Sequence, residues 1–329
     1  MVKTAKFANL EIPVPGFGAM GMSTAFGPSD DDESLKTLKH ALDIGCTFWD
    51  SAVVYGAGHN ESLLGRFFAA HPGSRERVFV ASKCGFECMG GGGFGTVTNK
   101  PSHIAEYIEG TRERLGSYPD LYYLHRIDEG TPLEESIPAL DRLWREGKTK
   151  YIGLSECSAA TLRKADSIAH IDAVQIEYSP WETGHERNGL IATAKELGVA
   201  IVAFSPLGRG LLTGKFNSTD DFAKEGDLRT VLPRLSPENL PHNLKLVRAV
   251  EALAAKKGCT PGQLSLAWVV AQGAIPIPGT RKEARLDENF GARDVDLTPE
   301  EVAEINRVIG EQELRGERYH EPMMKLVGK

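Results

Sequence analysis

Residues 121–155 read LYYLHRIDEGTPLEESIPALDRLWREGKTKYIGLS, and this stretch contains the pattern that decides the fold. Two short apolar runs, 121–125 and 151–155, enclose a segment, 133–145, whose apolar residues recur at helical spacing. Gly147 follows that segment, where glycine commonly ends a helix. The apolar runs lack period-2 alternation, as is typical of parallel strands covered on both faces. The stretch therefore predicts a strand, a helix and a second, parallel strand.

The same alternation continues in both directions along the chain. Further strands are expected at 16–20, 46–50, 78–83, 173–177, 199–204 and 274–277. Further helices are expected at 31–44, 103–115, 161–168, 187–197, 243–257 and 261–271. Eight strand-then-helix units favour a closed (β/α)8 barrel, a TIM barrel, over an open sheet. The 329 residues fit one such barrel, so we expect a single α/β domain over residues 1–329.

Three segments do not fit a bare barrel. Residues 7–15 predict a short hairpin that closes the N-terminal mouth. Residues 298–309 predict an extra helix, followed by an extended tail to Lys329. Residues 217–243 are polar and contain three prolines, so we expect a long loop after the seventh strand.

The composition, with 41% hydrophobic and 25% charged residues, is ordinary for a soluble globular protein. The formal net charge of −7 argues against nucleic acid or an anionic membrane as the main partner. No apolar run approaches the roughly 20 residues that cross a bilayer, and the first residues lack the apolar stretch of a secretory signal. The five cysteines, an odd number, indicate a reduced, cytoplasmic protein, and a zinc site from Cys84, Cys88 and a distant histidine is the disfavoured alternative. The oligomeric state stays open.

Four chemically active side chains fall at or just past the ends of three successive expected strands. They are Asp50, Tyr55, Lys83 and His125. Taken singly, each has a structural alternative: a strand-end cap, a surface charge or a buried core histidine. Taken together they are expected at the C-terminal face, where barrel enzymes place their catalytic groups.

This combination suits the reduction of a carbonyl group, because hydride transfer leaves an alkoxide that needs a proton. The tyrosine side chain has an ordinary pKa of about 10, and a neighbouring ammonium lowers it by stabilising the phenolate. Lys83 is expected to supply that ammonium, and Asp50 to hold it in place. His125 is expected to hydrogen-bond and orient the substrate oxygen, or to relay the proton.

Two glycine-rich segments resemble phosphate loops but lack the necessary context. Residues 16–21 match the pattern GxGxxG, yet prolines precede it and a glycine–proline pair soon follows it, so a dinucleotide-binding strand and helix are not expected there. The run 90–93 is not followed by Gly-Lys-Ser or Gly-Lys-Thr, and we expect a mobile loop beside the end of the third strand.

Phosphate groups are instead expected beside the last two strands, as is usual in this barrel. Residues 205–210 offer backbone amides and Arg209, and Lys215 lies just beyond them. Arg281, Lys282 and Arg285 stand at an expected helix N-terminus, which attracts anions. Arginine pairs bidentately with phosphate, so we expect Arg281 to be the main contact to a phosphate group of a bound cofactor. The alternative is an ordinary basic helix start on a solvated surface.

Residues 48–65, FWDSAVVYGAGHNESLLG, resemble the signature of the aldo-keto reductases. Lys83, His125 and the segments 153–155, 204–210 and 275–280 follow in the order that the family shows. The resemblance covers nearly the whole chain, and it is strongest to the branch that contains YakC-like reductases, perakine reductase and pyridoxal reductases. It implies a (β/α)8 barrel, a nicotinamide cofactor extended across the C-terminal face, and Tyr55 as the proton donor. With this cofactor, the arginines after the last strand favour NADPH, with Arg281 as the main contact to the 2′-phosphate.

The resemblance also implies which residues hold the cofactor. Ser155 and Gln175 would hold the nicotinamide carboxamide, Phe204 would stack on the ring, and Glu288 and Asn289 would touch the adenine. The expected cofactor residues are Met20, Ser155, Gln175, Phe204, Ser205, Pro206, Leu207, Arg209, Gly210, Lys215, Gly279, Arg281, Arg285, Glu288 and Asn289. Position 156, usually asparagine in the family, is glutamate here, and Phe204 stands where tyrosine or tryptophan is common.

The substrate pocket is expected from loops at 20–27, 86–97, 126–127, 178–181 and 319–324, with Trp181 as the first candidate for its wall. Aromatic and aliphatic residues there suit a small or medium aldehyde or ketone of modest polarity. We therefore expect an NADP-dependent oxidoreductase that reduces aldehydes and ketones to alcohols. One version is a pyridoxal reductase. A hypothesis of another class is an NADPH-binding regulatory subunit with slow turnover, like the potassium-channel β subunits of this family.

Overall fold

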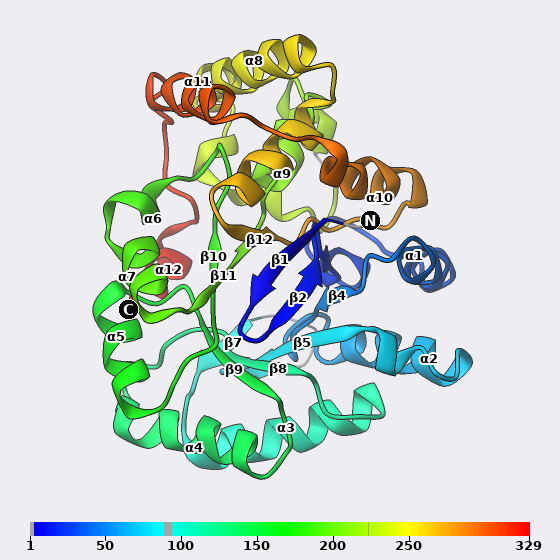
Figure 1. Cartoon of the computed structure of the whole chain (residues 1–329), viewed down its shortest axis with the longest axis vertical. Helices are drawn as coiled ribbons and strands as arrows, with labels where there is room; N and C mark the ends of the chain where they lie inside the picture. The colour runs from blue at the N-terminus through cyan, green and yellow to red at the C-terminus, as the bar shows by residue number, and fades with distance from the viewer. Residues whose placement is uncertain (1–2, 89–93, 223) are drawn as a thin grey trace.

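The structure is a computed structural model, and it describes residues 3–88, 94–222 and 224–329. Its centre is a sheet of eight strands in the order β12-β11-β10-β9-β8-β5-β4-β3, with every neighbouring pair parallel. The strands are β3 (Phe17–Gly18), β4 (Phe48–Asp50), β5 (Phe79–Cys84), β8 (Leu121–Leu124), β9 (Tyr151–Ser155), β10 (Ala173–Glu177), β11 (Ala200–Phe204) and β12 (Ala274–Pro276). Helices surround these strands (Figure 1). The predicted (β/α)8 barrel is confirmed.

The first and last strands close the barrel. The amide of Gly16 donates to the Pro276 carbonyl at 2.9 Å, and the amide of Gly18 donates to the Pro278 carbonyl at 3.2 Å. A Cβ at Gly18 would lie 2.7 Å from the Ile277 carbonyl oxygen, so only glycine permits this approach. Gly18 of the GxGxxG segment is therefore explained by barrel closure.

The helices are α1 (Asp31–Ile44), α2 (His59–Ala70), α3 (Pro101–Leu115), α4 (Leu133–Arg145), α5 (Ala159–Ile168), α6 (Gly184–Arg187), α7 (Leu190–Leu197), α8 (Leu240–Lys257), α9 (Pro261–Ala271), α10 (Glu283–Phe290), α11 (Pro299–Gly310) and α12 (Glu321–Met324). The predictions for α1, α4 and α9 agree with these bounds. The helix expected over 187–197 ends as predicted but begins only at Leu190, because Gly189 takes a φ of 85° and separates α6 from α7. Among the described residues, no helix combines the length and apolar character that a bilayer crossing needs.

Other segments also differ from the expectations. Part of the expected loop at 86–97 is an antiparallel pair, β6 (Phe86–Cys88) and β7 (Phe94–Val97), while the glycine run 90–93 lies outside the described residues. The expected loop at 217–243 contains three short 3-10 helices, η4 (Thr219–Phe222), η5 (Leu228–Val231) and η6 (Pro233–Leu235), and then the start of α8. The expected extended tail contains α12.

The N-terminal hairpin is present, but it starts earlier than expected, with β1 (Thr4–Phe7) and β2 (Leu10–Pro13). It lies over the middle of the strands in Figure 1. The Phe7 ring meets those of Phe79 and Tyr151 edge-on, each at 5.2 Å between centroids. The hairpin therefore supplies apolar side chains to the barrel interior.

The chain returns to the barrel at its C-terminal end. The amide of Gly328 donates to the Glu156 carbonyl at 2.8 Å, and the amide of Ser158 donates to the Lys329 carbonyl at 2.7 Å. These bonds fix the tail beside the end of β9. Ser158 is also the N-cap of α5, and its side chain accepts from the Thr161 amide.

Candidate active site

Three neighbouring strands and the turn after one of them bring together the four residues of the predicted catalytic tetrad. Asp50 ends β4, Lys83 lies near the end of β5, His125 follows β8, and Tyr55 lies in the turn after β4. The Lys83 ammonium donates to the Asp50 carboxylate and, at 2.7 Å, to the Ser51 carbonyl. It also donates to the Tyr55 hydroxyl at 3.2 Å. The Tyr55 and His125 rings meet edge-on, with centroids 5.8 Å apart.

The electrostatics of this cluster are set by burial and by the ion pair. Burial acts to lower the pKa of Lys83, but the Asp50 carboxylate and Tyr55 outweigh it and raise that pKa. Burial raises the pKa of Tyr55, and the Lys83 charge offsets only part of this effect. The expectation that lysine brings the phenol pKa below its ordinary value is therefore wrong in its net direction. Tyr55 is accordingly held in its protonated form.

His125 is held in its neutral form. Burial, and then the positive charges of Arg126 and Lys83, keep the pKa of His125 well below its usual range. A neutral imidazole can donate one hydrogen bond and accept another, so it can orient a carbonyl oxygen.

The turn that carries Tyr55 needs an unusual backbone. Gly56, Ala57 and Gly58 all have positive φ, and a Cβ at Gly58 would lie 2.8 Å from the Arg114 side chain. The buried side chain of Asn60 then ties this turn to β4, since it accepts from the Ser51 hydroxyl at 2.7 Å and donates to the Ala19 carbonyl at 2.9 Å. Asn60 was not expected from the sequence, because its burial and its two hydrogen bonds appear only in the folded structure.

The expected nicotinamide residues lie beside the tetrad. The Gln175 amide donates to Asp50 at 2.7 Å, and the Ser155 hydroxyl, at the end of β9, accepts from Arg126 at 3.4 Å. Met20 belongs to the 3-10 helix η1 (Met20–Met22) and packs against the cluster that contains Tyr55. Phe204 ends β11, and Ser205 after it takes a φ of 48°.

Glu156 has a different environment from the one that its position implies. Its φ is 54°, and its carboxylate forms a buried ion pair with Arg318 and accepts from the Glu177 amide at 2.8 Å. The His185 Nε2 lies 3.6 Å from Oε1 of Glu156, the carboxylate oxygen that Arg318 does not bond. Glu156 therefore holds the C-terminal tail in place, whereas the asparagine that is usual at this position in the family implies a contact with the nicotinamide.

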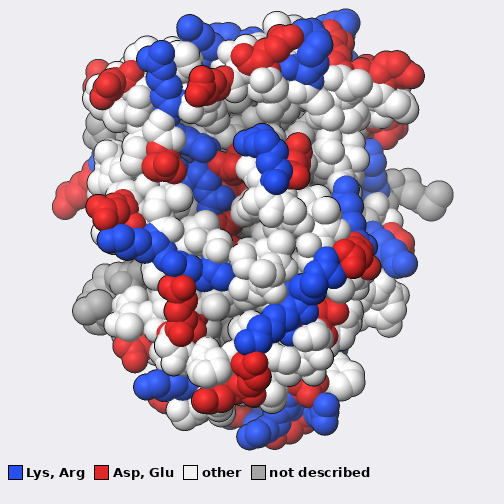
Figure 2. All heavy atoms as spheres, turned by 90° about the vertical axis from the view of Figure 1, so that its left-hand side faces the viewer, with Lys and Arg blue, Asp and Glu red and all other residues white. Residues whose placement is uncertain are grey.

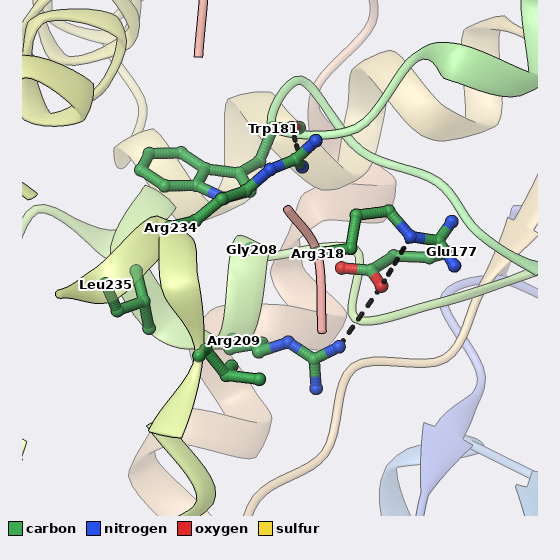
Figure 3. A pocket seen from close by; sticks show the side chains of 8 residues that line it. Glu177, Trp181, Gly208, Arg209, Arg234, Leu235 and Arg318 are labelled. Atoms are coloured by element: carbon green, nitrogen blue, oxygen red, sulfur yellow. Dashed lines mark hydrogen bonds and ion pairs between the residues drawn. The ribbon is translucent and has the colours of Figure 1, made fainter. Parts of the chain in front are cut away.

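The residues expected to bind phosphate do not all lie in one cluster, and some of them already pair with carboxylates. Arg209 donates to Glu177 at 3.1 Å (Figure 3). It also stacks over the Tyr319 ring, so its guanidinium is engaged in the interior. Lys215 and Glu288 form an ion pair at 3.0 Å. Residues 205–210, which include Ser205, Pro206, Leu207 and Gly210, turn into the 3-10 helix η3 (Gly208–Thr213).

The residues around β12 and α10 are placed as follows. Arg281 donates to the carbonyls of Phe26 at 3.0 Å and Gly27 at 3.3 Å, so it ties the loop after η1 to the segment after β12. Gly279 lies against the Gly18 carbonyl. Arg285 is exposed on α10, and Asn289 is buried on the same helix.

Trp181 is buried and lines a small pocket with Glu177, Gly208, Arg209, Leu232, Arg234, Leu235 and Arg318 (Figure 3). None of the residues that line this pocket belongs to the tetrad. No three His, Cys, Asp or Glu side chains within the described ranges are grouped to hold a metal ion. On the face drawn in Figure 2, basic and acidic side chains are interspersed.

Comparisons with known proteins agree with this geometry. The family model described as "Aldo/keto reductase family" matches residues 16–309. The chain is similar to an aldo-keto reductase of Gibberella moniliformis, with 52% identity over all of both chains. It is also similar to the aldo-keto reductase yakc [NADP(+)] of Schizosaccharomyces pombe, with 44% identity over 97% of this chain and 94% of the relative. Among solved structures, a glycerol dehydrogenase from Gluconobacter oxydans has a TM-score of 0.83 and 27% identity, over 94% of this chain and 96% of that one.

Proposed function

Because the chain belongs to the aldo/keto reductase family, we propose that it reduces a small aldehyde or ketone to an alcohol with NADPH, and that Tyr55 donates the proton. One observation carries this proposal. The Lys83 ammonium bonds both the Asp50 carboxylate and the Tyr55 hydroxyl, at 3.2 Å from the latter, inside a buried site. The name of the yeast relative, which includes NADP(+), supports the choice of cofactor.

The donors around the tetrad fit a nicotinamide cofactor. The Ser155 hydroxyl ends β9, and the Gln175 amide lies at the paired position of β10 and bonds Asp50, so the two suit a carboxamide. Lys215, Arg281 and Arg285 follow the last two strands, where this barrel holds phosphates. When bound, a dihydronicotinamide supplies a hydride to the carbonyl carbon.

The side chains of the tetrad then have separate tasks. His125 hydrogen-bonds the carbonyl oxygen and fixes its direction relative to Tyr55. As negative charge develops on that oxygen, the Tyr55 hydroxyl transfers its proton to it, because an alkoxide is a stronger base than a phenolate. The Lys83 ammonium stabilises the phenolate that remains, and Asp50 keeps Lys83 charged and in place. The buried position of all four keeps water from competing for the oxygen.

The experiment is a panel of aldehydes and ketones, with pyridoxal included, assayed by the loss of NADPH absorbance. A reverse panel of alcohols with NADP+ tests the opposite direction. We expect reduction of several small aldehydes, with NADPH preferred over NADH. If the purified protein bound NADPH tightly and turned over no member of either panel, the enzymatic proposal would be wrong and the regulatory-subunit hypothesis would replace it.

A further inference from the structure

Arg126, the residue after His125, is a buried cation beside the tetrad. Only 4% of its surface is exposed. Its Nη1 donates to the His125 carbonyl at 2.6 Å and to the Ser155 hydroxyl at 3.4 Å. The guanidinium therefore lies at the C-terminal ends of β8 and β9, between the residue expected to orient the substrate and the residue expected to contact the nicotinamide.

The other interior cations around this site each have a carboxylate partner. Lys83 pairs with Asp50, Arg318 with Glu156, and Arg209 with Glu177. Arg126 differs from them, because no carboxylate of the described residues forms an ion pair with it. The Arg126 charge acts on the Glu156 carboxylate beyond ion-pair distance, and Glu156 already accepts from Arg318 and from a backbone amide.

One edge of the Arg126 guanidinium is also unused. Within the described part of the chain, Nε has no hydrogen-bond partner, and neither of the two bonds that the side chain donates comes from Nη2. Nε and Nη2 together form the planar fork that pairs with both oxygens of a carboxylate. A buried cation without a directly paired anion costs free energy, so the protein gains when a carboxylate pairs with the free edge of Arg126.

We propose that Arg126 binds a carboxylate group carried by the carbonyl substrate. This inference rests on the proposed function and narrows it to aldehydes or ketones that bear an acid group. The basic residues suited to the cofactor phosphates, such as Arg281 and Lys215, belong to other segments, after β12 and β11. The carboxylate would therefore come from the substrate that reaches Tyr55 and His125.

The test compares two aldehydes of the same shape, 4-carboxybenzaldehyde and its neutral isostere 4-carbamoylbenzaldehyde. We expect the wild-type protein to favour the carboxylate by about tenfold or more in kcat/KM, as a charge-assisted bond predicts. In Arg126→Met that preference is expected to disappear, and in Arg126→Lys it is expected to survive in part. Arg163→Met, which removes an arginine that pairs with Glu196 at the surface, is the matched control and is expected to keep the wild-type preference.

The outcomes separate this inference from the proposed function. If the wild type reduces both aldehydes equally well, or if Arg126→Met slows both by the same factor, Arg126 is a positioning residue and the inference is overturned. If the wild type reduces neither aldehyde, and no other carbonyl compound either, the proposed function fails with it. Should Arg126→Met not fold, as judged by circular dichroism, the wild-type ratio and the Arg126→Lys ratio decide: a ratio near one in the wild type overturns the inference.

Discussion

Glu156 and Arg318, which are 162 positions apart in the sequence, form an ion pair in the interior of the protein. Arg318 also lies 3.6 Å from Glu177 at the end of β10. Burial opposes the charge on Glu156, but Arg318 and His185 outweigh burial and hold the pKa of Glu156 below its usual range. The pair therefore ties the C-terminal segment to two strands that carry predicted cofactor residues.

Removing one partner of this pair is expected to destabilise the fold. Glu156→Gln removes the carboxylate that Arg318 bonds, while Glu177 stays 3.6 Å away, and this should lower the free energy of unfolding by about 3 kcal/mol, the low end for breaking a buried pair. Urea denaturation followed by circular dichroism measures the change. Glu196→Gln is the matched control, since it breaks the exposed pair with Arg163, and we expect it to cost less than about 1 kcal/mol. Equal losses in the two variants would show that the buried pair does not hold the tail.

The neutral state of His125 predicts a dependence of stability on pH. The folded pKa is depressed, whereas the unfolded chain takes up a proton at about pH 6.5. Below that pH the unfolded state binds more protons, so the free energy of unfolding falls as the pH is lowered, by up to about 1.4 kcal/mol per pH unit. Above that pH this contribution is constant.

His125→Asn isolates this effect, because it removes the titrating group and leaves the other groups in place. The stability difference between wild type and variant should stay level above about pH 6.5 and shrink as the pH falls from there. Denaturant titrations at half-unit steps of pH measure it. A difference that stays level down to pH about 5 would mean that folded His125 titrates at its ordinary pKa.

Arg281 is predicted to select NADPH over NADH. Arg281→Ala removes a fork that suits the 2′-phosphate, so we expect NADPH to bind about tenfold or more weakly while NADH changes by only about twofold. Titration of cofactor fluorescence gives both dissociation constants. The structure offers a rival explanation, because Arg281 also anchors the carbonyls of Phe26 and Gly27. If the binding of NADPH and of NADH weakens by the same factor, then anchoring this loop is the only role of Arg281.

The fold could be predicted from sequence because its signals are local. Apolar runs such as 151–155 and 173–177 agree with β9 and β10, and the acidic start of α1, with Asp30 as its N-cap, marks that helix. The order of strand and helix then leaves few topologies. The tetrad could also be predicted from the sequence, since parallel strands place their last residues at one edge of a sheet or barrel.

The rest depends on contacts between distant residues, which a local pattern does not reveal. Arg209 lies in a segment that the sequence predicts to bind phosphate, yet its guanidinium donates to the Glu177 carboxylate on the neighbouring strand. Glu156 has a partner near the other end of the chain. The turn that carries Tyr55 gains its shape from positive φ angles and from Asn60, and neither follows from apolar periodicity.

The central claim is that the hydroxyl of Tyr55 donates the proton, and Tyr55→Phe tests it most directly because it removes one oxygen and keeps the ring. The measurement pairs NADPH affinity, from cofactor fluorescence, with single-turnover reduction of the best aldehyde in the panel. We predict an affinity within a few-fold of wild type and a loss of reduction of at least about a hundredfold. Reduction at the wild-type rate by a correctly folded Tyr55→Phe protein would contradict the account.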